Sequence, residues 1–538
     1  MDPIEYLRWA GEQAAAKFAN IEAVVYFSRA LDLIPETDTT DQYPLRLARE
    51  NVYHIQGARE AQSQDLAALA KLAQALDDDK RRAEVALRQA RYAIVTGDFV
   101  AAIAAAQAAI RLAQGNPVTD QEAEGHLAWG QALWRLGDYT AARSHLGWAL
   151  RLARMAHSPQ VEADSLRDIG IVFTHQNNYA EARIYFEQGL RISRALRDRW
   201  GESASLNNLG VIALRLGDEA VAKGCFEQAL IIRREIGHRQ GEGEVFNNLG
   251  ALSESQGNYA WTSVYYEQAL RICRSVGDRR GEDLALGNLG ATFHHLGDEG
   301  RAKTYYEQAL QICREIGDRR GEAETLNHLA LLSHQMGDHP AACEACQPAL
   351  LIARDLGDRS LQAYAVIHLG HALTGLERLT EAVDAYRLAL ELRRELDEHN
   401  LAMEALAGLA RVSLAQGDMT QALAKVEEIC KYLNADTLWG TEEPLRVYLT
   451  CYRVMQAGQD PRARSILNAA HNLLQERAAK ILDKDMRRAF VENVSIHREI
   501  LSERNSFAPG LTAGGSSGRQ NDSLAPQQSL HASLAAYP

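Results

Sequence analysis

Two cysteines in this chain of 538 residues have a spacing that could hold a metal ion. Cys343 and Cys346 are separated by two residues, as in many zinc sites, but a zinc site needs two further ligands close by. Cys346 lies forty residues after Tyr306 and forty before Tyr386, where the chain otherwise carries large aromatic residues. We therefore expect Cys346 to be a core residue, and we expect no metal site here.

The sequence contains none of the common catalytic motifs. It has no G-x-x-x-x-G-K-[ST] loop, no G-x-G-x-x-G after a strand pattern, and neither a G-x-S-x-G nor an H-E-x-x-H motif. Because no known pattern assembles a nucleophile, a base or a phosphate-binding loop, we expect a protein that is not an enzyme and that carries no cofactor.

Histidines are concentrated in one part of the chain, and imidazole can bind a metal or change its charge near neutral pH. Two interpretations are open, a metal or pH-sensing site and a polar lining of a binding surface, and we favour the lining. The residues are His294, His295, His328, His334, His368 and His371.

Arginines also recur at intervals of forty residues, in a connection between helices. In a structural interpretation they pair with Glu or carbonyl groups of the adjacent unit, and in a functional one they form a cationic ridge for an acidic partner. We favour the structural interpretation for Arg199, Arg239, Arg279, Arg280, Arg319, Arg320 and Arg359.

The strongest candidate for a binding site is a set of polar residues that recur once in forty, which we call the asparagine ladder: Asn208, Asn248, Asn288, His328 and His368. The preceding position reads Asn207, Asn247, Gly287 and Asn327. An amide offers both donors and an acceptor, so it can bind the main chain of an extended peptide without selecting a side chain. The alternative is that these amides bond carbonyl groups within the array.

A repeat of 40 residues positions all of these side chains. A small residue recurs at one place in each copy: Gly130, Gly170, Gly210, Gly250, Gly290, Ala330, Gly370 and Ala410. A fixed period of this length indicates one supersecondary unit that is copied and stacked, which is the organisation of a solenoid.

Each repeat predicts two helices. Leu206, Leu209 and Ala213 lie at spacings of three and four, which places them on one apolar helix face. Gly217 suits the left-handed residue after a helix, and Asp218 suits the N-cap of the next one. The fold class we expect is all-α, an α-solenoid of antiparallel helix pairs.

The pattern resembles the tetratricopeptide repeat. That family places W-x-x-L-G-x-x-Y in the first helix, then Ala, Phe and Ala in the second helix, then Pro. The first unit matches at Leu7, Ala10, Gly11, Ala14, Ala23, Phe27, Ala30 and Pro35, and the central units match as in Leu206, Leu209, Gly210, Ala213, Ala222, Phe226 and Ala229. The resemblance covers roughly residues 1–436 and implies a right-handed superhelix.

The central units lack the closing Pro and have 40 residues instead of about 34. This longer form looks like the repeats of kinesin light chains and of large bacterial regulators related to the maltose-regulon activator. In the family, the residue two before the small first-helix residue commonly lines a concave groove. The resemblance therefore implies a peptide-binding role for Asn207, Asn208, Asn247, Asn248, Asn288, Asn327, His328 and His368. The family's two-carboxylate clamp is missing, because Val211 and Ala251 stand where it needs Lys or Arg.

We expect four regions in the chain. They are irregular repeat units at 1–160, the regular array at 161–436, a C-terminal helical cap at 437–504, and a disordered tail at 505–538 that is rich in Gly, Ser, Pro and Gln.

Composition restricts the partners. The formal net charge is −13 and no basic stripe occurs, which argues against binding to nucleic acid. No apolar run approaches the roughly 18 residues of a membrane helix, and the N-terminus lacks the apolar stretch of a signal peptide. We expect a cytoplasmic protein that binds neither membranes nor nucleic acid.

Two functions of different classes fit these observations. The first is a scaffold that binds a peptide or protein segment in the concave groove. The second is a regulatory or sensor module, because the array looks like the C-terminal region of large bacterial signalling ATPases, cyclase-linked regulators and transcriptional regulators. The chain itself contains no ATPase, cyclase or helix-turn-helix segment, so the second function implies a fragment or a standalone relative of such a regulator.

Overall fold

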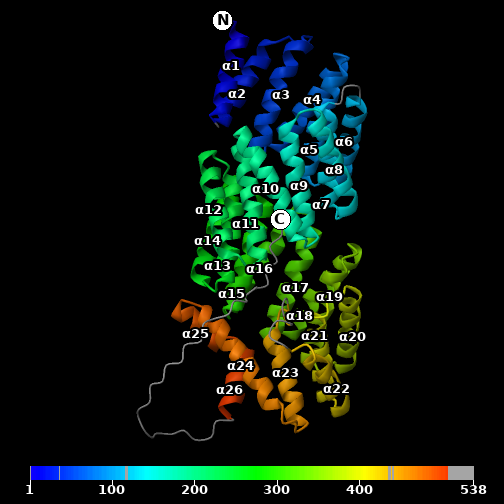
Figure 1. Cartoon of the computed structure of the whole chain (residues 1–538), viewed down its shortest axis with the longest axis vertical. Coiled ribbons are helices and arrows are strands. Elements are labelled where there is room, and N and C mark those ends of the chain that lie inside the picture. The colour runs from blue at the N-terminus through cyan, green and yellow to red at the C-terminus, as the bar shows by residue number, and fades with distance from the viewer. Residues whose placement is uncertain are drawn as a thin grey trace. The chain divides into compact units, whose positions relative to one another are not determined.

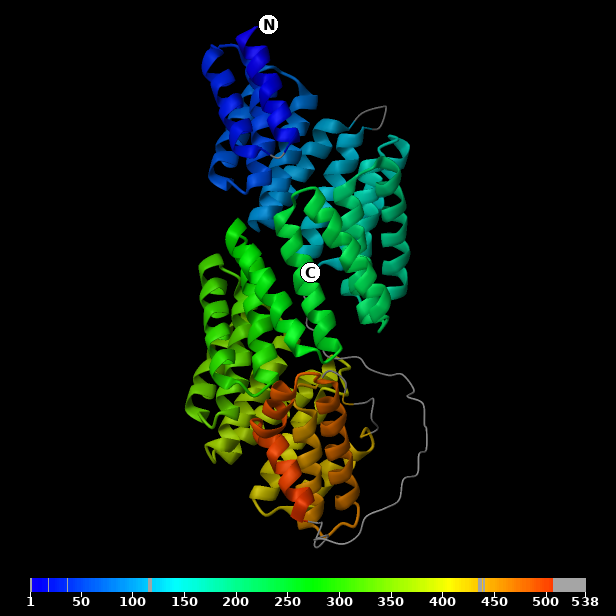
Figure 2. The same cartoon turned by 90° about the vertical axis from the view of Figure 1, so that its left-hand side faces the viewer.

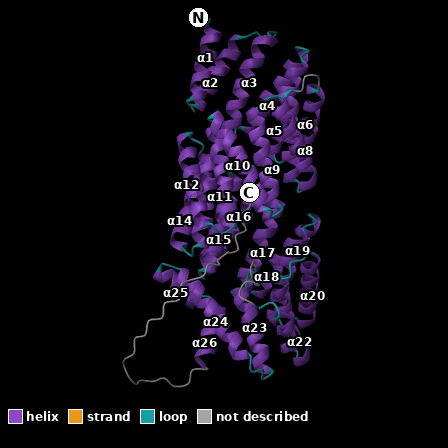
Figure 3. Cartoon of the chain, in the orientation of Figure 1, coloured by secondary structure: helices purple, strands orange, loops and turns teal. Residues whose placement is uncertain are grey.

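The computed structural model describes residues 2–17, 19–35, 37–114, 119–433, 438 and 441–506. These residues form helices joined by short turns, and no strand occurs among them (Figure 1, Figure 3). The all-α solenoid expected from the sequence is confirmed. The expected tail at 505–538 lies outside the described residues, except for 505 and 506 at the end of the last helix.

The helices form two compact units, residues 1–238 and 239–538. Odd-numbered helices from α1 to α21 are the first members of pairs and even-numbered helices are the second members; we call them first and second helices. The first helices are α1 (Pro3–Ala16), α3 (Thr39–Gln56), α5 (Asp79–Thr96), α7 (Asp120–Arg135), α9 (Pro159–His175) and α11 (Arg199–Arg215), then α13 (Arg239–Ser255), α15 (Arg279–His295), α17 (Arg319–Gln335), α19 (Arg359–Gly375) and α21 (Ala402–Ala415).

The second helices are α2 (Asn20–Leu33), α4 (Arg59–Ala75), α6 (Phe99–Ala113), α8 (Tyr139–Met155), α10 (Tyr179–Leu196) and α12 (Glu219–Glu235), then α14 (Tyr259–Val276), α16 (Glu299–Ile316), α18 (His339–Asp355), α20 (Leu379–Glu395) and α22 (Met419–Cys430). Four further helices follow: α23 (Pro444–Ala457), α24 (Ala463–Lys480), α25 (Lys484–Glu492) and α26 (Ser495–Ser506).

Helix boundaries are set locally by the residues between the helices. Gly217 adopts a φ of 80°, a left-handed conformation that glycine reaches without steric cost. The next residue, Asp218, accepts a hydrogen bond from the backbone N–H of Val221 at 3.1 Å and so caps α12. Similar caps recur along the array, which explains why the repeat keeps its length.

A small residue and a large one pack together within each pair. A Cβ atom on Gly250 would lie 2.4 Å from a ring carbon of Tyr266, sixteen residues later, and Gly170, Gly210, Gly290 and Gly370 face Phe or Tyr in the same way. The repeat with Ala330 has Cys346 in place of the aromatic residue, and both side chains are fully buried. This supports the expectation that Cys346 is a core residue.

Successive first helices lie next to one another within each unit. In the second unit α13 contacts α15, α15 contacts α17, α17 contacts α19 and α19 contacts α21. No comparable contacts join successive second helices in the described part of the chain. First helices therefore line the inner side of the array, and second helices line its outer side.

The last four helices belong to the second unit. Helix α23 packs against α21 and α22, the last pair of the array; α24 and α26 pack on α23, and α25 packs on α24 and α26. Figure 2 shows these orange and red helices beside the green and yellow helices of the same unit.

Candidate functional site

The structure places the asparagine ladder on successive first helices. Asn248 lies on α13, Asn288 on α15, His328 on α17 and His368 on α19, all in the second unit. The second unit thus brings four ladder positions to the inner side of one array. Asn207 and Asn208 lie on α11 in the first unit.

The two rows of predicted residues differ in exposure. Asn208, Asn248, Asn288 and His328 are partly exposed, and so is Asn207. Asn247 and Asn327, one position earlier on their helices, are only 6% and 3% exposed. Neither the Oδ1 of Asn247 nor either side-chain polar atom of Asn327 has a hydrogen-bond partner among the described residues.

At the C-terminal end of the ladder the position is already occupied. His368 is 1% exposed, and its Nε2 donates a hydrogen bond to the carboxylate of Glu442 at 2.7 Å. The ring of His328 stacks on Tyr306 with a centroid separation of 5.2 Å. A ligand could reach His368 only after Glu442 had moved away.

Glu443 lies in a second network beside this contact. Its carboxylate accepts a hydrogen bond from Gln335 Nε2 at 2.8 Å and forms an ion pair with Arg446 at 2.6 Å. Gln335 in turn accepts a hydrogen bond from His294 Nε2 at 2.6 Å. The backbone N–H of Glu443 donates to Glu404 Oε1 at 2.9 Å. Glu443 thereby joins α17 and α21, and Gln335 extends the network to α15.

His371 forms a third network, which is buried. Arg411 donates hydrogen bonds to His371 Nδ1 at 3.0 Å and to the hydroxyl of Tyr386 at 2.9 Å, and that hydroxyl lies 2.7 Å from the same Nδ1. Because Nδ1 accepts from Arg411, His371 is a neutral imidazole with its proton on Nε2. That Nε2 is 3.9 Å from the carboxylate of Glu443.

Most imidazoles of this region are held neutral. Burial lowers the pKa of His294 to about 4, although the hydrogen bond with Gln335 opposes the shift. Burial and then Arg446 lower the pKa of His334 to about 3. His368 differs: burial would lower its pKa, but the attraction of the Glu442 carboxylate outweighs it and raises the pKa above the usual value.

The pKa values of the carboxyl groups at this site are also shifted in opposite directions. Burial would raise the pKa of Glu443, but the attraction and hydrogen bond of Arg446 hold it at about 2, so Glu443 is ionised. Burial and then repulsion from Glu442 raise the pKa of Glu404 to about 7. Glu404 can therefore bind a proton near neutral pH, which reduces the repulsion among the three carboxyl groups.

Sequence reasoning found one side of this site and missed the other. The sequence singled out the histidines, but it gave Gln335 and Glu404 no role in these networks. Glu442, Glu443 and Arg446 lie after the last repeat, and no period relates them to it. Among the residues described, no group of three or more His, Cys, Asp or Glu side chains is placed to hold a metal ion.

Most of the recurring arginines pair with carboxylates. Arg279 bonds Glu282 at 2.6 Å, and Arg274 of the preceding second helix bonds the same carboxylate at 2.7 Å. The arrangement recurs at Glu202 and Glu322. These pairs favour the structural interpretation of the arginines over a cationic ridge.

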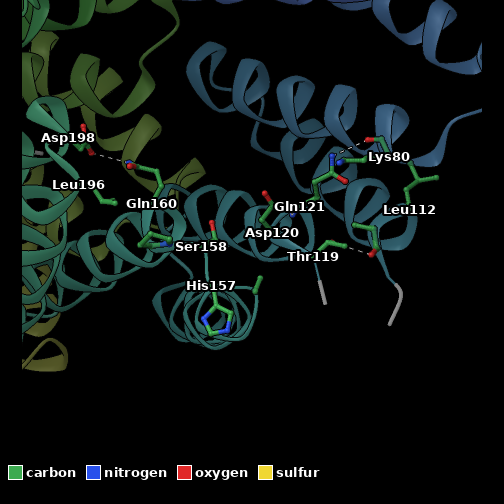
Figure 4. Close-up of a pocket in the computed structure, with 13 residues that line it drawn as sticks. Lys80, Leu112, Thr119, Asp120, Gln121, His157, Ser158, Gln160, Leu196 and Asp198 are labelled. Carbon is green, nitrogen blue, oxygen red and sulfur yellow. Dashed lines mark hydrogen bonds between the residues drawn. The ribbon is translucent and has the colours of Figure 1, made fainter. Parts of the chain in front are cut away.

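The first unit contains a hollow of about 770 Å³ that is unrelated to the ladder (Figure 4). The starts of several first helices line it, and amides bridge neighbouring repeats there: Gln121 Nε2 donates to the carbonyl of Lys80 at 3.0 Å, and Gln160 Nε2 donates to Asp198 at 3.0 Å. The polar groups named here bond one another, so the hollow gives no indication of a ligand.

The chain contains tetratricopeptide repeats. Family models described as "Tetratricopeptide repeat" match residues 121–195, 203–236, 246–315 and 363–396. The matches include α13 to α15 and α19, which carry Asn248, Asn288 and His368. The family match supports a protein-interaction scaffold as the class of function. In the described part of the chain, no helix is both long enough and apolar enough to cross a membrane.

No curated relative matches the chain. Solved structures with a similar fold include BtubC (BKLC) from P. vanneervenii, with 22% identity over 41% of this chain and 91% of that one and a TM-score of 0.34. The apo quorum sensor NprR from B. thuringiensis has 14% identity over 65% and 98% of the two chains and a TM-score of 0.47. Yeast Tom70 has 16% identity over 85% and 96% and a TM-score of 0.41. Likenesses this distant say nothing about a partner.

Proposed function

We propose that this protein is an interaction scaffold that binds an extended segment of a partner protein along the part of the asparagine ladder that lies in the second unit. The observation that carries the proposal is the recurrence of a polar side chain at one position of successive first helices, on the inner side of the second unit. Asn248, Asn288 and His328 are partly exposed there, so a ligand can reach them. An array of repeats creates an extended surface of this kind without any new element.

The spacing of the ladder suits an extended peptide. Packed helices lie about 8–10 Å apart, and an extended chain advances about 3.3 Å per residue. A bound segment would therefore meet a new ladder residue at about every third position. Because an amide both donates and accepts, it can bond the main chain of the segment at each meeting point. Recognition of this type accepts bound segments of many sequences, and the affinity increases with the length of the segment.

Buried amides support the same interpretation. The polar atoms of Asn327 have no partner among the described residues, and leaving such groups unsatisfied costs about 1–3 kcal/mol each. Because Asn327 is only 3% exposed, a ligand could bond these atoms only after neighbouring side chains had moved. The family match is consistent with a scaffold, and nothing in the site resembles an assembled nucleophile and base.

Partner capture from a lysate of the source organism tests the proposal. The bait is the full chain, beside a variant with Asn208, Asn248 and Asn288 all changed to Ala. The matched control changes three amides at one position of the outer second helices, Gln228, Gln268 and Gln308, to Ala. We expect partners that the native chain and the control retain and the ladder variant loses. Equal capture by all three proteins, each with unchanged helicity, would refute the role of the ladder.

A further inference from the structure

The segment just before α23 is held as a bound peptide would be. Residues 441–443 are not helical, and Glu443 has φ −124° and ψ 61°. Glu442 bonds His368 of α19, the carboxylate of Glu443 bonds Gln335 of α17, and its backbone N–H bonds Glu404 of α21. Two adjacent residues therefore contact three successive first helices, through two carboxylates and one main-chain donor.

The residues of the array that make these contacts favour carboxylate ligands. His368 and Gln335 each donate a hydrogen bond to a carboxylate of the segment, and Arg446, which follows the segment on α23, pairs with the same Glu443 carboxylate. His368 is 1% exposed, so a segment with apolar residues in place of Glu442 would leave a buried donor unsatisfied. Burial would lower the pKa of His368, but the Glu442 carboxylate outweighs burial and raises the pKa above its usual value, which is consistent with a charge-assisted hydrogen bond. Glu404 supplies the acceptor for the main chain.

The chain that follows stays beside the repeats that carry the ladder. A Cβ atom on Gly257, in the turn after α13, would lie 2.8 Å from the carbonyl oxygen of Lys480. A Cβ atom on Gly297, in the turn after α15, would lie 2.7 Å from Cβ of Asn493. The equivalent Gly337, after α17, has no atom within 4 Å of that position. The C-terminal segment therefore contacts the repeats of Asn248 and Asn288 as well as those of His328 and His368.

We propose that residues 441–443 are a built-in occupant of a carboxylate-binding site at the His368 end of the ladder, and that this site recognises two adjacent carboxylates in an extended segment of a partner. The inference rests on the proposed function and names the chemistry of its ligand. The partner's acidic pair replaces Glu442 and Glu443 at His368 and Gln335, so the chain's own segment competes with the partner.

Rescue by a small ligand tests this inference in the full chain. Changing Glu442→Gly and Glu443→Gly removes both carboxylates and leaves space for an added pair. The probes are the blocked dipeptides N-acetyl-Glu-Glu-amide and N-acetyl-Gln-Gln-amide, which differ in charge and hardly in size. Binding is measured by calorimetry, and retained structure is checked by circular dichroism. A third protein carries His368→Ala in addition.

We expect the glycine variant to bind the acidic dipeptide at least about tenfold more tightly than the neutral one, because hydrogen bonds to charged groups are the stronger kind. We expect the native chain to bind neither, and His368→Ala to abolish the preference. Equal binding of the two dipeptides would overturn the inference, and so would no saturable binding by a folded glycine variant up to about 10 mM, well above millimolar tethered concentrations.

The result of the dipeptide-binding experiment can be distinguished from the result of the partner capture. The dipeptides do not require the asparagines, so a ladder variant that captures partners normally would refute the proposed function while the carboxylate preference stood. Conversely, loss of the preference with ladder-dependent capture intact would refute this inference alone.

Discussion

Alanine at Gly250 should destabilise the second unit because its Cβ meets the ring of Tyr266. The added atom would lie 2.4, 2.6 and 2.9 Å from three ring carbons, so the ring has to retreat by roughly an ångström. The ring is 1% exposed, and its hydroxyl bonds Glu254 at 3.2 Å, so it cannot turn outward freely. Overpacking of this kind costs about 1–3 kcal/mol.

A matched control removes the opposing contribution of helix propensity. Replacing Gly by Ala within a helix gains up to about 1 kcal/mol wherever space allows. Gly287 lies inside α15, and a Cβ there would have no atom within 4 Å. Gly287→Ala should therefore stabilise the unit, and the two alanine variants should differ by about 1–3 kcal/mol. A leucine at Gly250 should lie at the upper end of that range.

Urea unfolding followed by far-ultraviolet circular dichroism measures the difference, and hydrogen exchange of α13 and α14 shows whether the effect is local. A repeat array need not unfold in two states, so the local measurement is the decisive one. The double variant Gly250→Ala, Tyr266→Cys copies the natural pair Ala330 and Cys346 and should show a favourable coupling energy. Equal effects at Gly250 and Gly287 would refute the close contact between Gly250 and Tyr266.

Two further outcomes are expected. The pKa values of His294 and His334, about 4 and 3, are depressed below 6.5, so both groups stabilise the fold above pH 6.5 and lose that contribution as pH falls. The pKa of Glu404, raised to about 7, opposes this by stabilising as pH falls from 7 towards 4.5. Burial lowers the pKa of His126 and His497 to about 4, so they act in the same direction as His294 and His334, whereas Asp283, whose pKa burial raises to about 6, acts with Glu404. Stability in urea unfolding should therefore fall between pH 7 and 5, by roughly 2 kcal/mol or more, and a rise in stability would contradict this. Arg393 is fully buried and bonds Glu398 at 2.5 Å, so Arg393→Ala should cost about 3 kcal/mol in the same assay, and a loss under 1 kcal/mol would show that the pair matters little.

The helix pairs could be predicted because local residues determine them. Gly217 and Asp218 end one helix and cap the next whatever the rest of the chain does, and the spacing of Leu206, Leu209 and Ala213 fixes the buried face of α11. A small residue and a ring, such as Gly250 and Tyr266, recur sixteen residues apart in several copies. These features repeat, so each copy confirms the others.

The occupied end of the ladder could not be predicted in this way. The contact between His368 and Glu442 joins residues 74 positions apart, and one of them lies beyond the last repeat. A helical pattern in residues 441–503 indicates that helices form, but it contains no information about the helix on which they pack. The acidic pair before Pro444 reads as an ordinary turn until its partners are known.

Occupation by the chain itself sets a condition on any partner. If the docked form is populated about a hundredfold more than the open form, the apparent affinity of a competitor falls by about a hundredfold. This corresponds to about 2.7 kcal/mol of binding free energy. A partner with only an acidic pair gains nothing over Glu442 and Glu443, which are tethered at a millimolar effective concentration. It must add contacts that the tethered residues 441–443 do not make, and the partly exposed Asn248 and Asn288 offer them. A partner segment should therefore gain affinity in steps of about three residues as it is lengthened from the acidic pair towards α13. A smooth or absent dependence on length would indicate that only the His368 end binds.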